Sequence, residues 1–316
     1  MKENLSYIIK RLLYLIPVIL GVCFIVFFLF NLVSGDPATN YLGPHAKPET
    51  INELRELWGL NQPWYLQYFD IVKSAFTLDF GKSRSSNQVI MELISKRALP
   101  SLMISFPAFF ISTVLSILLA MVTAHYRGKG IDYVVRIVCI AMMSISSLTY
   151  ILFFQWYFGF ELDWFYIDGF EADLGFFSNL PYIILPVIIW VILSIGPDVR
   201  FFRTIILDEI YQDYVRTARA KGLSETKVLL KHVLANSMIP ILTYTIIQLP
   251  FLLLGSLLLE QFFSIPGLGD LMITAINESD FPVIKAMTIL SAMAYLVFTI
   301  IQDIMYVLVD PRVKLK

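Results

Sequence analysis

Few side chains of this chain have the types and spacing that bond-making chemistry needs. The 316 residues contain three histidines and two cysteines, and these lie far apart, without the spacing of metal ligands. The tripeptide Gly-Lys-Ser at residues 81–83 could hold a nucleotide phosphate, but Phe76 stands where such a loop needs its first glycine. The sequence therefore predicts no catalytic residue, no metal site and no cofactor in this chain.

Three carboxylates interrupt apolar runs, where a charge is costly and is often functional: Asp198, Glu260 and Asp303. Glu260 is followed by Pro266, Gly267 and Gly269, which predict a tight turn. Two roles are open for this carboxylate. It is either an outer gate or a contact for an external protein, or it accepts hydrogen bonds from the backbone amides of the turn.

A serine-rich stretch follows Met142 and Met143. Ser144, Ser146 and Ser147 place hydroxyl groups beside adaptable methionine side chains, as a pathway for varied solutes would require. Small residues also let helices pack closely, and that interpretation explains the pattern equally well.

The composition places these residues in a membrane protein. Hydrophobic residues make up 57% of the chain and charged residues 16%, whereas soluble domains carry about a quarter charged residues. The net charge of −1 gives no indication of a nucleic-acid partner. Each of six apolar runs is long enough to cross a lipid bilayer as a helix: residues 12–33, 99–124, 133–158, 182–202, 239–262 and 286–309. We therefore expect an all-α integral membrane protein with six transmembrane helices.

The distribution of charge orients these helices. Lys and Arg concentrate before the first span, between the second and third, between the fourth and fifth, and after the last. The loop between the third and fourth spans has only acidic charges. Because cytoplasmic loops are rich in Lys and Arg, we expect both termini to be cytoplasmic. Residues 1–98 would form the first span and a long extracytoplasmic segment, residues 99–309 a five-helix core, and residues 310–316 a cytoplasmic tail.

Two amphipathic runs predict helices in the long outer segment. They are "ETINELRELWGL", from Glu49, and "WYLQYFDIVKSAF", from Trp64. We expect both helices to lie at the membrane surface or on the outer face of the protein.

The cytoplasmic segment 208–242 predicts a helix, a break and a second helix. Gly222 suits a left-handed position after the first helix, and Ser224 suits the N-cap of the second. A helical hairpin between two spans would be a mechanical contact for another protein. A solvated basic loop is the alternative that the pattern leaves open.

The chain resembles the B-type permeases of oligopeptide and dipeptide ABC importers, which depend on a binding protein. The resemblance rests on motifs in the family's order along almost the whole chain: "YIIKRLLYLIPVILGV", "SGDPA", "GLNQPWYLQY", "DFGKS", "QDYVRTARAKGLS", "EQFFSIPGLG", "DFPVIKA" and "VDPRVK". The segment 208–242 is similar to the cytoplasmic EAA loop of these permeases, although Arg216, Thr217 and Ala218 replace Glu-Ala-Ala. Ser146 stands where family members often have a proline that bends the third span.

The resemblance implies a type I ABC importer permease, in the bacterial cytoplasmic membrane, that forms half of a translocation pathway. Its expected partners are a second, similar permease, two cytoplasmic ATPases that bind ATP and Mg²⁺, and an extracellular peptide-binding lipoprotein. The first helix of the loop would be the coupling helix, with contact positions Asp213, Tyr214, Arg216, Ala218 and Gly222. Nickel, a metallophore or another small solute is the alternative substrate. An ATP-independent channel or a membrane enzyme is the alternative from another class.

Overall fold

The computed structural model describes the backbone of residues 2–33, 35–43 and 45–309. The predicted tail 310–316 lies outside the described residues. The described chain is helical, apart from its loops and one isolated bridge between Lys82 and Val89. The first part consists of α1 (Lys2–Phe28), η1 (Leu29–Val33), α2 (Pro37–Leu42), α3 (Pro48–Leu57) and α4 (Trp64–Thr77). The core consists of α5 (Ile90–His125), α6 (Gly130–Ser144), α7 (Ser147–Phe154), η2 (Gln155–Glu161), α8 (Phe176–Ile210), α9 (Asp213–Ala220), α10 (Glu225–Lys227), η3 (Val228–Leu234), α11 (Ala235–Leu254), α12 (Leu257–Phe262), α13 (Leu268–Asn277) and α14 (Phe281–Val309).

Five stretches of the described helices are long and apolar enough to cross a membrane. They are Leu13–Asn31, Ile90–His125, Phe176–Ile210, Glu225–Leu252 and Phe281–Gln302. A sixth apolar stretch is broken, because α6 and the helix Ser147–Glu161 meet at an angle of 92°. The all-α membrane fold is confirmed. The third predicted span, residues 133–158, is present but broken. The predicted end of the fifth span at residue 262 was wrong, since α11 ends at Leu254.

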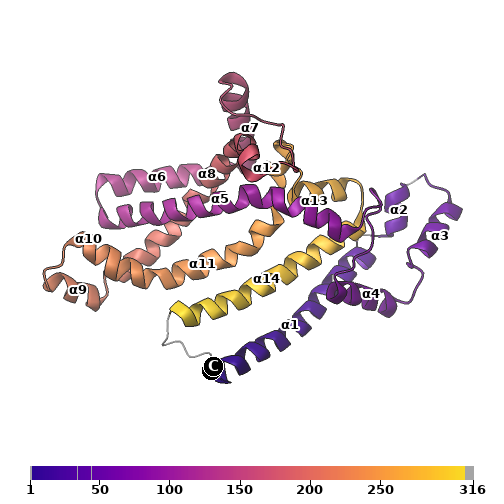
Figure 1. The fold of residues 1–316 in the computed structure, drawn as a ribbon, viewed down its shortest axis with the longest axis horizontal. Helices are drawn as coiled ribbons and strands as arrows, with labels where there is room; N and C mark the ends of the chain where they lie inside the picture. The colour runs from indigo at the N-terminus through magenta and orange to yellow at the C-terminus, as the bar shows by residue number, and fades with distance from the viewer. Residues whose placement is uncertain (1, 34, 44, 310–316) are drawn as a thin grey trace.

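The broken pair carries the chain back along the molecule. α5 and α8 lie side by side and run in the same direction, because Ile104 and Ile183 share one core cluster and Ala124 and Phe202 share another (Figure 1). The chain between two parallel neighbours must return from the end of the first to the start of the second. α6 and α7 make this return, and the bent pair therefore serves as the sixth span.

Serines end one helix and begin the next at this break. The Ser144 hydroxyl donates to the carbonyl of Ile140 at 2.8 Å, and the Ser146 hydroxyl accepts from the Thr149 amide at 3.2 Å. Ser146 has an extended backbone and is the N-cap of α7. A serine cap thus produces the bend without a proline at this position.

α6 also packs closely along α8, at two places. A Cβ on Gly196 would lie 2.9 Å from Cγ of Met143 and 3.1 Å from the carbonyl oxygen of Cys139, so only glycine fits. Nearer α9, the buried Asp132 accepts hydrogen bonds from Nε and Nη2 of Arg203 at 2.9 and 3.0 Å. This paired arrangement fixes the start of α6 to α8.

The two helices predicted in the outer segment are confirmed as α3 and α4. α4 packs on α1, since Ala75 shares a core cluster with Ile19 and Cys23, and the Tyr68 hydroxyl donates to the Leu20 carbonyl at 3.0 Å. This segment lies at the end of the molecule opposite α9 (Figure 1).

Candidate functional site

Helix α9 is amphipathic, and one of its faces is part of the protein core. Val215 is fully buried and Ala218 is 5% exposed, in a cluster that includes Phe202 of α8 and Val228 of η3. The opposite face is open, because the side chain of Arg216 is 71% exposed. α9 is thus fixed to the long helices on one side and presents a free surface on the other.

The C-terminal end of α9 is close to the position that Gly222 predicted, and the helix begins at Asp213. Gly222 adopts a left-handed conformation with a φ of 77°, and its amide donates to the Arg219 carbonyl at 2.9 Å. Ser224 occupies the N-cap position of α10, but its side chain makes no capping hydrogen bond. An ion pair of 2.6 Å between Arg219 and Glu225 links the two helices instead.

Tyr214 connects α9 to the end of α8. Its hydroxyl donates a hydrogen bond to Glu209. Burial and this hydrogen bond raise the pKa of Tyr214 to about 12, so the phenol remains a donor at neutral pH. Asp213, by contrast, is 97% exposed and makes only a 3.5 Å contact with Arg216.

Gly222→Ala is expected to weaken the C-terminal end of α9 by about 1 kcal/mol, because an L-residue is strained in the left-handed region. Hydrogen exchange of the α9 amides should then be roughly fivefold faster. Gly130→Ala is the matched control, since Gly130 has no positive φ and open space at its Cβ. Equal exchange in both variants would contradict a strained position at residue 222.

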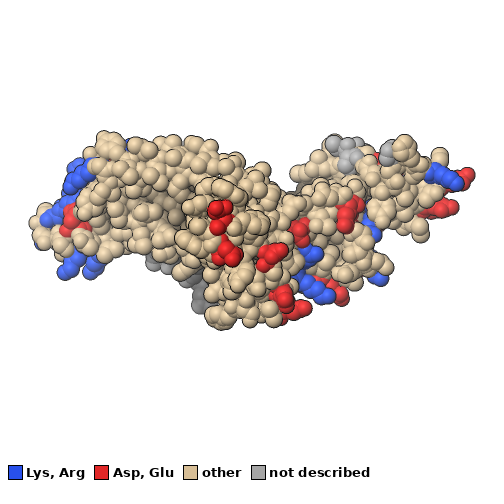
Figure 2. Space-filling model, turned by 90° about the horizontal axis from the view of Figure 1, so that it is seen from above, with Lys and Arg blue, Asp and Glu red and all other residues tan. Residues whose placement is uncertain are grey.

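Basic side chains gather around the end of the molecule that carries α9. Figure 2 shows Lys and Arg around this end with a smaller group of Asp and Glu among them, and both signs of charge over the middle and the opposite end of the same face. Arg127 and Lys129 follow α5 there, and Arg216, Arg219 and Lys221 lie on or next to α9. This arrangement agrees with the charge asymmetry of the sequence.

Glu260 organises a turn at the far end of α11. Its carboxylate accepts hydrogen bonds from the Ser101 hydroxyl (2.7 Å) and from the amides of Ser256 (3.1 Å), Gly269 (2.6 Å) and Asp270 (3.1 Å). The side chain is 1% exposed. Glu260 therefore accepts hydrogen bonds from the backbone amides of the turn, which is one of the two roles considered for it. Its role as an outer gate stays a prediction.

The turn closes around this carboxylate because three glycines give it room. A Cβ on Gly255, Gly267 or Gly269 would lie 1.9, 2.3 or 2.9 Å from a Glu260 oxygen. Pro266 and Gly267 lie in the predicted turn between α12 and α13, whereas Gly269 lies in the first turn of α13. Sequence reasoning missed Gly255, whose φ of 69° ends α11, and Ser101 of α5.

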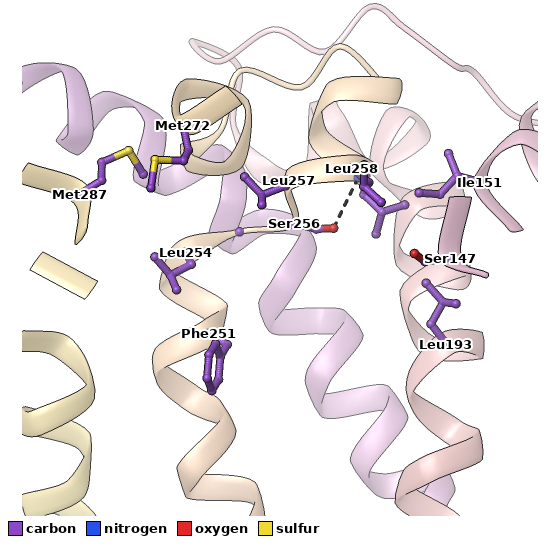
Figure 3. Close-up of a pocket in the computed structure, with 12 residues that line it drawn as sticks. Ser147, Ile151, Leu193, Phe251, Leu254, Ser256, Leu257, Leu258, Met272 and Met287 are labelled. Carbon is purple, nitrogen blue, oxygen red and sulfur yellow. Dashed lines mark hydrogen bonds between the residues drawn. The ribbon is translucent and has the colours of Figure 1, made fainter. Parts of the chain in front are cut away.

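A cavity of about 480 Å³ lies between α7, α8, the end of α11 and α12 (Figure 3). It is lined by Ser147 and Ile151 of α7, Leu193 of α8, Phe251 and Leu254 of α11, residues 255–259, Met272 and Met287. The lining is mainly apolar. Discontinuous helices form binding sites in many membrane transporters, and this cavity is the candidate pathway.

The three predicted pathway serines do not share one position. Ser147 lines the cavity, whereas Ser144 and Ser146 use their hydroxyls at the break between α6 and α7. Their role in a pathway stays a prediction. Asp198 accepts a hydrogen bond from Tyr244 at 2.9 Å, and the side chain of Asp303 lies outside the described residues.

Six apolar stretches of the described residues, one of them broken, and an amphipathic helix packed against α5, α8 and α11 indicate a multi-span membrane protein. The chain belongs to the family of binding-protein-dependent transport system inner membrane components. The model of this family matches residues 116–315, and the model of the family's N-terminal region matches residues 4–105. The resemblance noted in the sequence is therefore confirmed, and the chain is the permease component of an ABC importer in the inner membrane.

Similarity to characterised permeases extends over almost the whole chain. The chain is 33% identical over 312 residues to the glutathione transport system permease protein GsiC of Shigella flexneri serotype 5b (strain 8401). The aligned residues cover 99% of this chain and 100% of that protein. The protein of the same name from Salmonella typhi is also 33% identical, and that from Escherichia coli (strain K12) is 32% identical, with the same coverage.

Proposed function

We propose that this chain forms half of the pathway of an ATP-driven importer for short peptides and transmits ATPase motion through α9. The packing of α9 is the observation that carries this proposal. One face of the helix joins α5, α8 and η3 in a single core cluster, so a displacement of α9 moves the ends of these helices together. The exposed face, which includes Asp213 and Arg216, would contact the ATPase.

The mechanism needs partners, and the family's dependence on a binding protein supports them. An external lipoprotein delivers the peptide, and a second, similar permease supplies the other half of the pathway. Two cytoplasmic ATPases bind ATP and Mg²⁺ and close on each other. Their closure pushes α9 and rocks the membrane helices between inward-facing and outward-facing states.

The basic end of the molecule would face the cytoplasm under the positive-inside rule. With six crossings, both termini lie on that side. α9 is then accessible to the ATPases, and the acidic loop between η2 and α8 is extracytoplasmic.

The relatives support a peptide as the substrate. They are named for transport of glutathione, which is itself a small peptide. Dipeptides and oligopeptides remain the class proposed for this chain, with nickel or a metallophore as the alternative.

The test is uptake of labelled dipeptide, tripeptide, glutathione and nickel complex by cells that express the complete transport operon. Arg216→Glu should reduce peptide uptake at least tenfold, because it reverses a charge on the exposed face of α9. Stability should stay within about 0.5 kcal/mol, as for other surface substitutions.

Lys227→Glu is the matched control, an exposed lysine of α10 outside α9. Uptake of nickel complex alone would contradict the peptide assignment and leave the coupling role in place. Undiminished peptide uptake by a correctly assembled Arg216→Glu variant would contradict the coupling role. Uptake that persists without the ATPases would instead indicate a channel.

A further inference from the structure

A second cavity, of about 380 Å³, lies between the outer segment and the start of α14. Helices α3 and α4, which contribute lining residues, lie at the end of the molecule opposite α9 (Figure 1). Its lining is mostly polar and includes Asn31, Trp58, Gln67, Arg84 and Lys285. It shares no lining residue with the apolar cavity of about 480 Å³ described above.

Arg84 lines this cavity and has one guanidinium nitrogen without a hydrogen-bond partner among the described residues. The central carbon of its guanidinium lies 3.3 Å from the centre of the Trp58 ring, so the two groups stack. Its Nη1 atom is buried and has no hydrogen-bond partner in the part of the chain that the structure describes. Burial lowers the pKa of Arg84 to about 10, so the group remains charged at neutral pH. A buried charged donor without a partner is costly, and an anionic ligand would relieve that cost.

Lys285 places a second cation in the same cavity. Its ammonium donates to Oδ1 of Asn31 at 3.1 Å, and the Asn31 amide in turn donates to Gln67 at 2.6 Å. These partners are neutral. Among the described side chains, no carboxylate lies within 4 Å of the charged nitrogens of Arg84 or Lys285.

Asp280, just before α14, is a buried carboxylate whose charge acts on Arg84. Its Oδ2 atom is already in use, whereas its Oδ1 atom is buried and has no hydrogen-bond partner among the described residues. Its Oδ2 atom accepts hydrogen bonds from the Ser83 hydroxyl at 2.6 Å and from the backbone amides of Arg84 and Ser85 at 3.0 and 3.2 Å. Burial opposes the ionisation of Asp280, but these hydrogen bonds outweigh it and lower its pKa. Asp280 therefore fixes the loop that carries Arg84.

Two further carboxylates, Glu56 and Asp70, also line the cavity, and both are exposed. The cavity thus offers half-buried cations and solvent-exposed anions. This separation of charge suits a zwitterion better than a simple anion.

We propose that this cavity binds the charged ends of a short peptide. The peptide carboxylate would lie between Arg84 and Lys285, where a guanidinium can hold it with two parallel hydrogen bonds. The amino group would lie toward Glu56 and Asp70. The identity of the ligand rests on the proposed function, whereas the site rests on the contacts of this chain.

The experiment measures binding to the full-length chain in nanodiscs of zwitterionic lipid, without the external binding protein. The probes are trialanine, trialanine amide, N-acetyl-trialanine and inorganic phosphate. Trialanine should bind at least tenfold more tightly than its amide, which lacks the carboxylate. Arg84→Gln and Lys285→Met should each weaken trialanine binding about tenfold, whereas Lys285→Arg should retain it. Lys73→Gln, which changes an α4 lysine outside the cavity lining, should leave binding unchanged.

Equal binding of trialanine and its amide by the unmodified protein would overturn the proposal without reliance on any variant. Phosphate that displaces trialanine at equal concentration would overturn the peptide assignment. Binding of trialanine that does not change in Arg84→Gln and Lys285→Met would overturn the site. Peptide uptake by the complete transporter tests the proposed function separately, so uptake without this binding would contradict only the inference drawn from the cavity.

Discussion

Glu260→Gln is expected to destabilise the protein by about 3 kcal/mol and to abolish most transport. The carboxylate accepts four hydrogen bonds from buried donors. A glutamine has only one acceptor oxygen, and its amide group would face two of these donors. Each unsatisfied buried donor costs about 1–3 kcal/mol. The turn between α12 and α13 should therefore lose its attachment to α5.

Thermal unfolding in detergent, followed by tryptophan fluorescence, measures the loss of stability. Glu278→Gln is the control, because this exposed residue lies just after α13. A stability equal to that of the unmodified protein would show that the Glu260 hydrogen bonds do not hold the turn together.

Asp132→Asn is expected to cost about 3–5 kcal/mol, because it removes the anionic partner of a buried arginine. The Arg203 side chain is 16% exposed and makes two hydrogen bonds to Asp132. The Gly128 amide also donates to this carboxylate at 3.0 Å. The variant should release the start of α6 from α8, and peptide uptake should fall with stability.

A double substitution distinguishes the ion pair from a simple packing defect. Asp132→Asn combined with Arg203→Met should recover more than half of the stability lost in Asp132→Asn, because no uncompensated buried charge remains. Unfolding midpoints of the two single variants and the double variant measure this coupling. Strictly additive losses would contradict the expected role of the pair.

The sequence predicted the elements that depend on local signals. Long apolar runs and clustered basic residues identified the crossings, and the position of Gly222 identified the end of α9. The break after Ser144 was harder to predict, because serine disfavours a helix only weakly. The hydrogen bond between Ser101 and Glu260 joins residues 159 positions apart, and no pattern in either segment records it. Local patterns therefore gave the helices, whereas the contacts that close the turn depend on the folded chain.

The break between α6 and α7 also indicates which side of the molecule does not face lipid. Helix ends leave amides and carbonyls without partners within the helix, and acyl chains offer none. Ser146 satisfies one of these amides, but Met143 and Ile145 beside it are 47% and 44% exposed. The Tyr150 and Ser144 hydroxyls donate to the carbonyls of Met142 and Ile140, and any backbone group still without a partner would need water or a second polypeptide. The exposed stretch around Ser144–Ser146 is thus poorly suited to contact with hydrocarbon.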